Sequence, residues 1–357
     1  MSAGDMPSGT NPQLNWQQLG NIGSTAKILE TVSDAFTETD QSRLAWNEVL
    51  NNGCAAKDLD MVSLALRKGA ELRLCNPDGS NHLHRAIMDE QIELLDRLLF
   101  AGADVVAVDS TGRNALHIAS SHAGLDVLTV YHGHRKKETI ARYLIEDGAP
   151  VNHRAPDGDT ALHFAVSTGD RLLVKALLDG DASVNIRNKK GFIPLHAAVS
   201  TSVFDQIIRM LLFEGASPTA QDNARRTPLH LIRTDREEGT MAADLLLQNG
   251  ADHSTCAANG DQAIHSACRR SNWSILERLF EAGASVHDRG GKGRMVLHVA
   301  AKYGREEPID RLIHMGADVD AVDGQGWTLL QYAVNGKYQG VVSRLLEHQK
   351  NLSERKK

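Results

Sequence analysis

The chain is poor in cysteine and aromatic residues, and it has no long apolar run. Four cysteines occur in 357 residues without a Cys-x-x-Cys pair, which argues against a disulfide framework and favours a reducing compartment, the cytoplasm or nucleus. No apolar run approaches the roughly 20 residues of a membrane helix. Residues 1–23 lack the basic stretch and apolar core of a secretory signal. We therefore expect no membrane association.

Excess positive charge is also lacking. Lysine and arginine number 39 against 45 acidic residues, for a net charge of −6, which argues against a nucleic-acid partner although it leaves room for a local basic face. Aromatic residues make up only 4% of the chain. Such a composition is typical of a thin, layered core in which leucine and alanine supply most of the buried surface.

What the chain does contain is a recurring six-residue motif. Residues 160–165 read Thr-Ala-Leu-His-Phe-Ala, in which Thr160 can cap a helix while Leu162 and Ala165 face one side. The histidines of the motif form a column whose members are 33, 46, 33, 34, 35, 33 and 33 residues apart when the glutamine of the eighth copy is included. A near-constant step indicates one supersecondary unit stacked many times. The column is His84, His117, His163, His196, His230, His265, His298 and Gln331.

A second column repeats with the same register. Gly-Ala pairs follow apolar helical runs, as at Gly102, Gly148 and Gly215, where a glycine can end a helix in the left-handed conformation. One copy has Asp181 in the glycine position, and aspartate tolerates that conformation better than most residues. We expect the helix to end there in the same way.

Taken together, these columns resemble the ankyrin repeat family. The pattern Asp-x-x-Gly-x-Thr-Pro-Leu-His-x-Ala followed by a second helix and Gly-Ala-Asp-Val is matched at 109–119 and again from Asp323 onward. The resemblance covers about residues 41–349 and implies an all-α solenoid of about nine repeats, each with a turn, two antiparallel helices and a β-hairpin-like finger loop. It also implies that the repeat histidines are structural and tie neighbouring repeats together.

The resemblance sets the expected domain organisation. Residues 1–40 form an N-terminal segment, partly disordered, with a possible helix at 26–36 that caps the stack or, alternatively, binds a partner. The repeat domain spans 41–349, and 350–357 form a polar tail. The third repeat is 13 residues longer than the usual step of 33, and we place an insertion at about 122–137, as a solvated or partner-binding loop between its two helices.

Motifs for catalysis and metal binding are not found. The turn at 290–293 reads Gly-Gly-Lys-Gly without the context of a phosphate-binding loop, and no Gly-x-Ser-x-Gly elbow occurs. Outside the column, His122, His132 and His134 form the one local cluster, and they lack a neighbouring cysteine or acidic ligand at a known metal spacing. We expect no enzyme activity, cofactor or metal.

The exposed surface therefore remains as the candidate site. The resemblance places variable residues on the finger tips and on the exposed face of each first helix, where cations gather in the C-terminal half, whereas Asp89, Glu90 and Glu93 occupy the corresponding region near the N-terminus. Ordinary solvated charge is the alternative interpretation. The predicted partner-binding residues are Arg154, Arg187, Arg233, Arg236, Arg269, Arg270, Lys302, Tyr303 and Trp327.

The function predicted from these observations is that of a scaffold or adaptor. We expect a chain that is monomeric by itself and binds an acidic protein partner through its finger loops and concave groove, with the cations forming a stripe. Two alternatives stay open: a regulatory or inhibitory subunit of an enzyme or transcription factor, and an enzyme with a site on the groove. Fold alone does not decide among them.

Overall fold

All regular structure in the described part of the chain is helical. The computed structural model describes residues 40–73, 79–121, 130–200, 205–233 and 237–355, so the predicted helix at 26–36 lies outside the described residues. Within those ranges helices alternate with turns, and the only strand-like pairings are three isolated bridges at finger turns, Val108–Asn114, Arg289–Met295 and Val322–Thr328. The predicted all-α solenoid class is confirmed.

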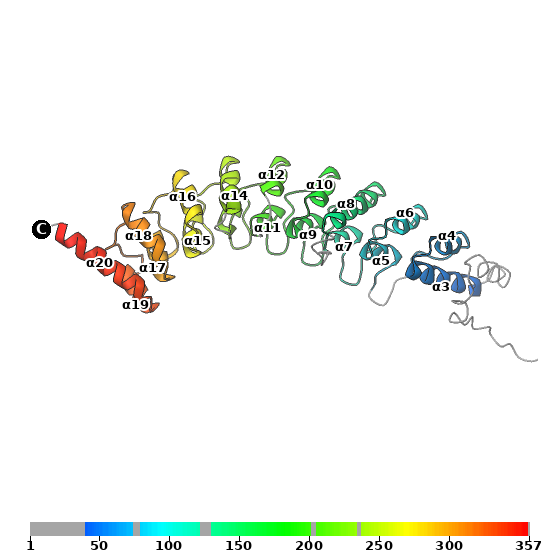
Figure 1. Ribbon diagram of the computed structural model, residues 1–357, viewed down its shortest axis with the longest axis horizontal. Helices are drawn as coiled ribbons and strands as arrows, with labels where there is room; N and C mark the ends of the chain where they lie inside the picture. The colour runs from blue at the N-terminus through cyan, green and yellow to red at the C-terminus, as the bar shows by residue number, and fades with distance from the viewer. Residues whose placement is uncertain (1–39, 74–78, 122–129, 201–204, 234–236, 356–357) are drawn as a thin grey trace, which may run out of the picture. The chain divides into compact units, whose positions relative to one another are not determined.

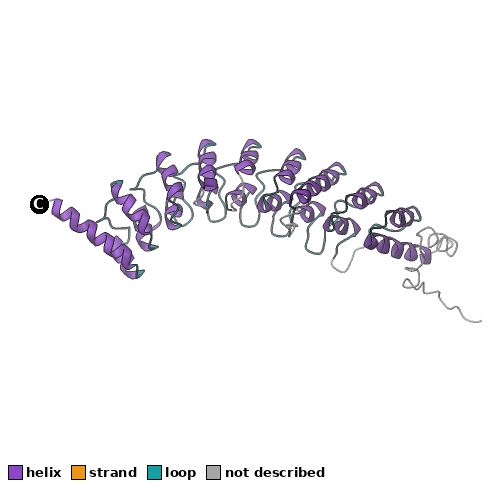
Figure 2. Ribbon diagram, viewed as in Figure 1, coloured by secondary structure: helices purple, strands orange, loops and turns teal. Residues whose placement is uncertain are grey.

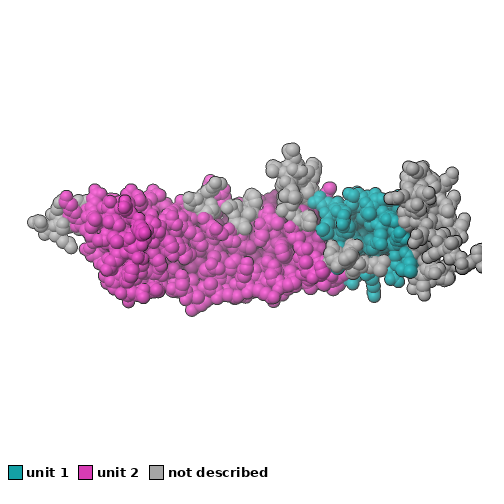
Figure 3. Space-filling model, turned by 90° about the horizontal axis from the view of Figure 1, so that it is seen from below, with its two compact units in different colours: residues 1–104 teal, residues 105–357 magenta. Residues whose placement is uncertain are grey.

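The chain divides into two compact units, residues 1–104 and 105–357 (Figure 3). In unit 1, two helix pairs pack on one another, and the first helix of the first pair buries Trp46, Val49 and Leu50. The described residues of unit 1 form α3 (Asp40–Ala56), α4 (Leu59–Arg67), α5 (His82–Met88) and α6 (Ile92–Phe100).

Unit 2 consists of seven helix pairs within its described residues, arranged as two rows (Figures 1 and 2). Each first helix packs on the next first helix along the chain. We call the side formed by the first helices and the finger turns the first-helix face. The first helices are α7 (Ala115–Ser121), α9 (Ala161–Thr168), α11 (Pro194–Ser200), α13 (Pro228–Leu231), α15 (Ala263–Arg269), α17 (Val296–Lys302) and α19 (Leu329–Asn335).

The second row of unit 2 carries amphipathic helices that bury their apolar side against the first row. In α10, for example, Leu173, Val174 and Leu177 are fully buried, consistent with their helical spacing. A short 3-10 turn, η1 (Gly291–Gly293), precedes α17. The second helices are α8 (Val130–Glu146), α10 (Arg171–Asp179), α12 (Asp205–Phe213), α14 (Glu237–Gln248), α16 (Trp273–Glu281), α18 (Glu306–His314) and α20 (Gln339–Arg355).

The histidine column joins neighbouring repeats. The backbone N–H of Thr160 donates to Nδ1 of His163 (3.1 Å), and Nε2 of His163 donates to the carbonyl of Phe192 in the next finger turn (3.1 Å). Each histidine so placed satisfies a turn on both sides with a single neutral imidazole. The equivalent Nε2 contacts are His196 to Arg226 O (3.3 Å), His230 to Asp261 O (3.2 Å) and His265 to Arg294 O (3.1 Å).

At His298 the outward contact of the column is missing. His298 is fully buried and accepts from the backbone N–H of Met295 (3.3 Å), but its Nε2 has no hydrogen-bond partner. Burial lowers the pKa of His298, and the carbonyls of Ala321 and Trp327 are near enough to oppose that shift without completing a hydrogen bond. The eighth and ninth repeats are therefore joined without the bond that ties the preceding pairs.

The second helices end as the glycine column predicted. Gly102, Gly148 and Gly215 have φ angles of +82°, +85° and +81°, and Asp181 takes the same left-handed conformation with φ +63°. The aspartate therefore replaces glycine at some strain. Arg225, which stands in a glycine position of a finger turn, likewise has φ +57°.

Two predicted segments differ from expectation. Residues 130–137, expected in a loop between the helices of the third repeat, form the first half of α8, and Lys137 is buried at 6% exposure. The expected loop residues 122–129 lie outside the described residues. At the other end, α20 continues to Arg355, so most of the polar tail expected at 350–357 extends the last second helix.

Candidate functional site

A cavity of about 420 Å³ opens on the first-helix face between the eighth and ninth repeats. The eighth repeat contributes Lys302 from the end of α17 and Lys292 from η1, and the ninth contributes its finger turn and α19. We call this the Trp327 cavity. Its lining residues are Lys292, Lys302, Gln325, Trp327, Tyr332, Asn335 and Gly336.

The aromatic wall of the Trp327 cavity is held in place by a buried carboxylate. The Trp327 and Tyr332 ring centroids lie 5.1 Å apart, and the Tyr332 hydroxyl donates to Oδ2 of Asp323 (2.6 Å). Burial acts to raise the pKa of Asp323, but hydrogen bonds from Tyr332 and from the backbone N–H of Trp327 outweigh it and lower that pKa. Burial and Asp323 raise the pKa of Tyr332 to about 12. Trp327 is thus a fixed ring that remains 39% exposed.

Two lysines give the Trp327 cavity its charge. Lys302 lies with Nζ 5.6 Å from the centroid of the Tyr303 ring, and Lys292 is exposed at a left-handed position of the turn. Neither ammonium forms an ion pair with a described residue. Two ammonium groups beside two aromatic faces suit a ligand that is acidic and partly apolar.

The predicted finger arginines are engaged with neighbouring fingers. Arg154 donates through Nη2 to the carbonyl of Arg187 (2.5 Å), and Arg187 in turn donates to the carbonyl of Gln221. Both side chains remain exposed. They therefore brace consecutive finger turns, and only their remaining N–H groups are left for other contacts.

The predicted cations of the helix ends form a second group. Arg233 lies two residues after the four-residue helix α13. Arg269 and Arg270 end α15, whose seven residues place them about 10 Å from its finger end. Arg270 donates through Nη1 to the carbonyls of His230 (3.0 Å) and Ser266 (3.4 Å). The pKa of Arg270 falls to about 10 because of burial and, after that, the charges of Arg269, Arg233 and Arg226.

The structure thus brings some predicted residues together and separates others. Lys302 and Trp327 share one cavity, whereas Tyr303 caps α17 beside Lys302 without lining it. Arg236 lies outside the described residues. The sequence prediction missed Lys292 and Tyr332. Tyr332 could have been noticed as an aromatic residue directly after the histidine column, at a position that the other copies fill without tyrosine.

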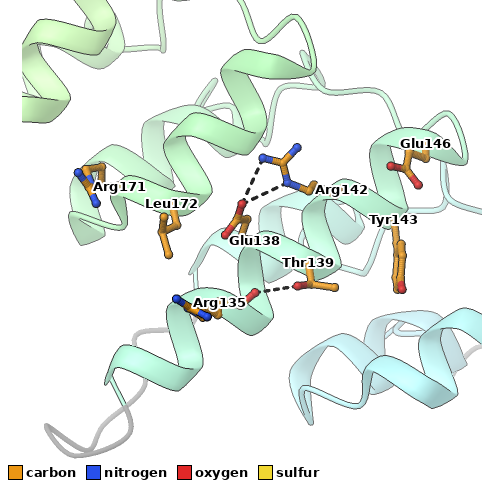
Figure 4. Close-up of a pocket in the computed structure, with 8 residues that line it drawn as sticks. All are labelled: Arg135, Glu138, Thr139, Arg142, Tyr143, Glu146, Arg171 and Leu172. Carbon is orange, nitrogen blue, oxygen red and sulfur yellow. Dashed lines mark hydrogen bonds and ion pairs between the residues drawn. The ribbon is translucent and has the colours of Figure 1, made fainter.

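A second cavity, of about 530 Å³, lies along the second helices α8 and α10 (Figure 4). Its central cation is neutralised, because Arg142 bonds both Glu138 and Asp179 at 3.2 Å. Arg171 donates to Gln206 (2.7 Å). The wall is therefore a balanced salt-bridged surface, which offers less to a charged ligand than the Trp327 cavity does. Its lining residues are Arg135, Glu138, Thr139, Arg142, Tyr143, Glu146, Arg171 and Leu172.

Two further properties of the described residues concern metal binding and membrane insertion. No group of three histidine, cysteine or acidic side chains is placed to hold a metal ion there, and the side chains of His122, His132 and His134 lie outside that description. Within the same residues, no helix is long and apolar enough to cross a membrane.

Stacked helix pairs tied by histidines, with an open first-helix face, define a protein-binding repeat scaffold. Comparison with known families agrees with this class. The family model for ankyrin repeats (3 copies) matches residues 50–136, 128–222, 195–290 and 274–356. The chain belongs to the ankyrin repeat family, whose domains are generally interaction modules rather than enzymes.

Individual relatives cover part of the chain. It is 28% identical over 206 residues to the nuclear factor NF-kappa-B p105 subunit of Gallus gallus, which is 57% of this chain and 16% of the relative. It is 31% identical over 203 residues to the B-cell lymphoma 3 protein homolog of Mus musculus, again 57% of this chain and 35% of the relative. The chain therefore spans well under half the length of these relatives.

A solved structure supports the fold. The ankyrin repeat domain of Bcl-3, described as a unique member of the IkappaB protein family, superposes with a TM-score of 0.54 at 25% sequence identity. The match covers 66% of this chain and 99% of that domain.

Proposed function

We propose that this chain is an adaptor that binds an acidic segment of a protein partner across the first-helix face of unit 2. The observation that carries the proposal is the Trp327 cavity, where a fixed, exposed tryptophan and two lysines without ion pairs among described residues converge. Exposed aromatic anchors of this kind dominate binding energy in protein interfaces.

The chemistry of the surface defines the partner segment. An apolar side chain would fill the cavity against the wall formed by Trp327 and Tyr332, and flanking carboxylates would meet Lys292 and Lys302. The cations Arg233 and Arg269 would extend the contact along the preceding repeats, and Arg154 and Arg187 would add exposed charge at the fingers. In this proposal the chain acts as a monomer without a catalytic step. Its free cysteines fit a reducing compartment, the cytoplasm or nucleus.

A narrower form of the proposal is that the chain is a regulatory subunit. Relatives whose names support it are the NF-kappa-B p105 subunit and protein phosphatase 1 regulatory subunit 27 of Mus musculus, the latter 36% identical over 84 residues, 24% of this chain and 46% of the relative. The bound partner would then be an enzyme or a transcription factor whose own surface is covered by the first-helix face.

The test compares three full-length baits in affinity purification with quantitative mass spectrometry. The baits are the natural chain, a Trp327→Ala/Lys302→Glu variant, and a Phe213→Ala control, in which an aromatic side chain 89% exposed at the end of a second helix is removed. Proteins lost from the first variant and retained by the control are expressed, and their binding is measured as a function of salt.

We expect the Trp327→Ala/Lys302→Glu variant to weaken binding at least about tenfold, as removal of a hot-spot residue does. Binding by the natural chain should also weaken as salt rises, because exposed charges are screened beyond about 8–10 Å. Partners that bind both variants equally, or that are lost only from Phe213→Ala, would contradict the assignment to the first-helix face.

A further inference from the structure

Three guanidinium groups gather at the carboxyl ends of two adjacent first helices. Arg233 follows the four-residue helix α13 after its C-cap Ile232, and Arg269 and Arg270 end α15, which packs on α13. Arg270 reaches back to the last turn of α13 through its bond to His230 O. We call Arg233, Arg269 and Arg270 the arginine cluster.

No described carboxylate forms an ion pair with an arginine of the cluster. Arg226 pairs with Asp222 (2.7 Å), and Arg142 bonds two carboxylates, but the Arg233 and Arg269 guanidiniums have neither an ion pair nor a hydrogen bond to a described residue. The charged groups that act on half-buried Arg270 are all arginines. Among the described residues, then, no carboxylate offsets the positive charge of the cluster.

The negative ends of the helix dipoles offset only part of the positive charge of the arginine cluster. The carbonyls of His230 and Ser266 at those ends accept from Arg270 alone, and a helix end carries roughly half an elementary charge. Arg305 supplies a further donor, through Nε to the carbonyl of Arg269 (2.9 Å). Local backbone groups thus hold Arg270, whereas Arg233 is exposed and Arg269 is half-buried without a bond from its guanidinium to a described residue.

We propose that the arginine cluster receives a phosphoryl group carried by the protein partner. A phosphoserine or phosphothreonine brings roughly −1.5 to −2 charges and three strong acceptor oxygens, which three guanidinium groups can bond at once. A single carboxylate neutralises one of the three charges and leaves the others in mutual repulsion. This inference rests on the proposed function and specifies the chemistry that the partner presents.

The geometry also sets the spacing within the partner. The cluster belongs to α15 and the Trp327 cavity to α19, two steps along the first-helix row. Neighbouring helices lie about 8–10 Å apart, so the two sites are roughly 16–20 Å apart. An extended chain covers that distance in about five or six residues. The partner segment should therefore carry its apolar anchor about six residues from its phosphorylated residue.

The experiment uses fluorescence anisotropy with the full-length chain and three labelled acidic peptides. Each peptide carries leucine about six positions from a residue that is phosphoserine, glutamate or serine. The protein variants are Arg233→Gln/Arg269→Gln, in which Arg270 keeps its carbonyl bonds, and Arg171→Gln, a control on an exposed arginine of a second helix. Inorganic phosphate serves as competitor, with chloride at equal ionic strength as its control.

We expect the phosphoserine peptide to bind the natural chain at least about tenfold more tightly than the serine peptide and more tightly than the glutamate peptide. That advantage should vanish in Arg233→Gln/Arg269→Gln, persist in Arg171→Gln, and be reduced by phosphate more than by chloride. Equal binding of the phosphoserine and glutamate peptides, or an advantage that survives in the double variant, overturns the inference.

The two proposals fail in different ways. A partner that depends on Trp327 but keeps its affinity after phosphatase treatment overturns the phosphoryl inference and leaves the proposed function standing. A phosphoserine peptide that binds through the arginine cluster and is indifferent to Trp327→Ala supports the phosphoryl site and contradicts the role of the Trp327 cavity.

Discussion

Replacing a single histidine of the column by glutamine tests the contributions of its two hydrogen bonds separately. In the ninth repeat Gln331 already stands in the histidine position, where its Oε1 accepts from the backbone N–H of Thr328 (2.8 Å). Glutamine can therefore reproduce the acceptor role that Nδ1 of His163 plays toward Thr160, but it lacks the rigid reach of Nε2 to Phe192 O. His163→Gln removes the bond between repeats and keeps the bond within the repeat.

The expected loss in the free energy of unfolding depends on which polar groups lose a hydrogen-bond partner. In His163→Gln the carbonyl of Phe192 loses its imidazole donor, which costs about 1–3 kcal/mol. In His298→Gln no such bond exists to be lost, since Nε2 of His298 has no partner. We expect that variant to cost less than about 1 kcal/mol, comparable to a volume-conserving change. His196→Gln should resemble His163→Gln, because its Nε2 contact is of the same type.

The assay is urea denaturation of the full-length variants, followed by circular dichroism, together with native-state hydrogen exchange of the amides in the next finger turn. His163→Gln and His196→Gln should lower the midpoint and speed exchange beside the substituted repeat. The reasoning is refuted if His298→Gln costs as much as the other two, or if all three variants are as stable as the natural chain.

Three further outcomes follow from described groups. Burial lowers the pKa of His117 to about 4, so the stability contributed by its neutral form is fully present above the ordinary pKa of 6.5. As pH falls from 6.5 toward 4, this contribution is lost by up to about 1.4 kcal/mol per pH unit. Urea midpoints that coincide at pH 7.5 and pH 5 would contradict this expectation. Asp181→Gly should raise stability by up to about 1 kcal/mol by relieving its left-handed strain, as a thermal melt can measure. Tyr332→Phe should cost about 1–2 kcal/mol by removing the bond to Asp323, and its tryptophan emission should change because Trp327 packs on the same ring.

The periodic features of this fold were predictable from the sequence. The histidine column and the glycine column recur from repeat to repeat, so their roles could be inferred from spacing and family resemblance. The same spacing places Asp181 and Arg225 in glycine positions. The helix at 130–137 could not. An insertion has no register to follow, and a segment that begins a helix early has the same local pattern as one that forms a loop.

The site was predictable only in part. Lys302 and Trp327 occupy positions fixed by the repeat register, which brought both to one cavity. The engagement of Arg154 and Arg187 with neighbouring finger carbonyls depends on side-chain reach across repeats, which the sequence does not display. The half-buried position of Arg270 likewise follows from how α13 ends after four residues, a local departure from the repeat pattern.

The missing bond at His298 has a thermodynamic consequence for recognition. In a stack where each unit contacts only its neighbours, every bond across a boundary adds to the coupling of the array, and the repeats that together enclose the Trp327 cavity lack the histidine bond. A ligand seated in that cavity bridges the two repeats and supplies coupling that the chain itself lacks. Binding energy is then spent partly on closing the stack, so occupancy should be readable as slower amide exchange throughout α19 and α20, far beyond the atoms that the ligand touches.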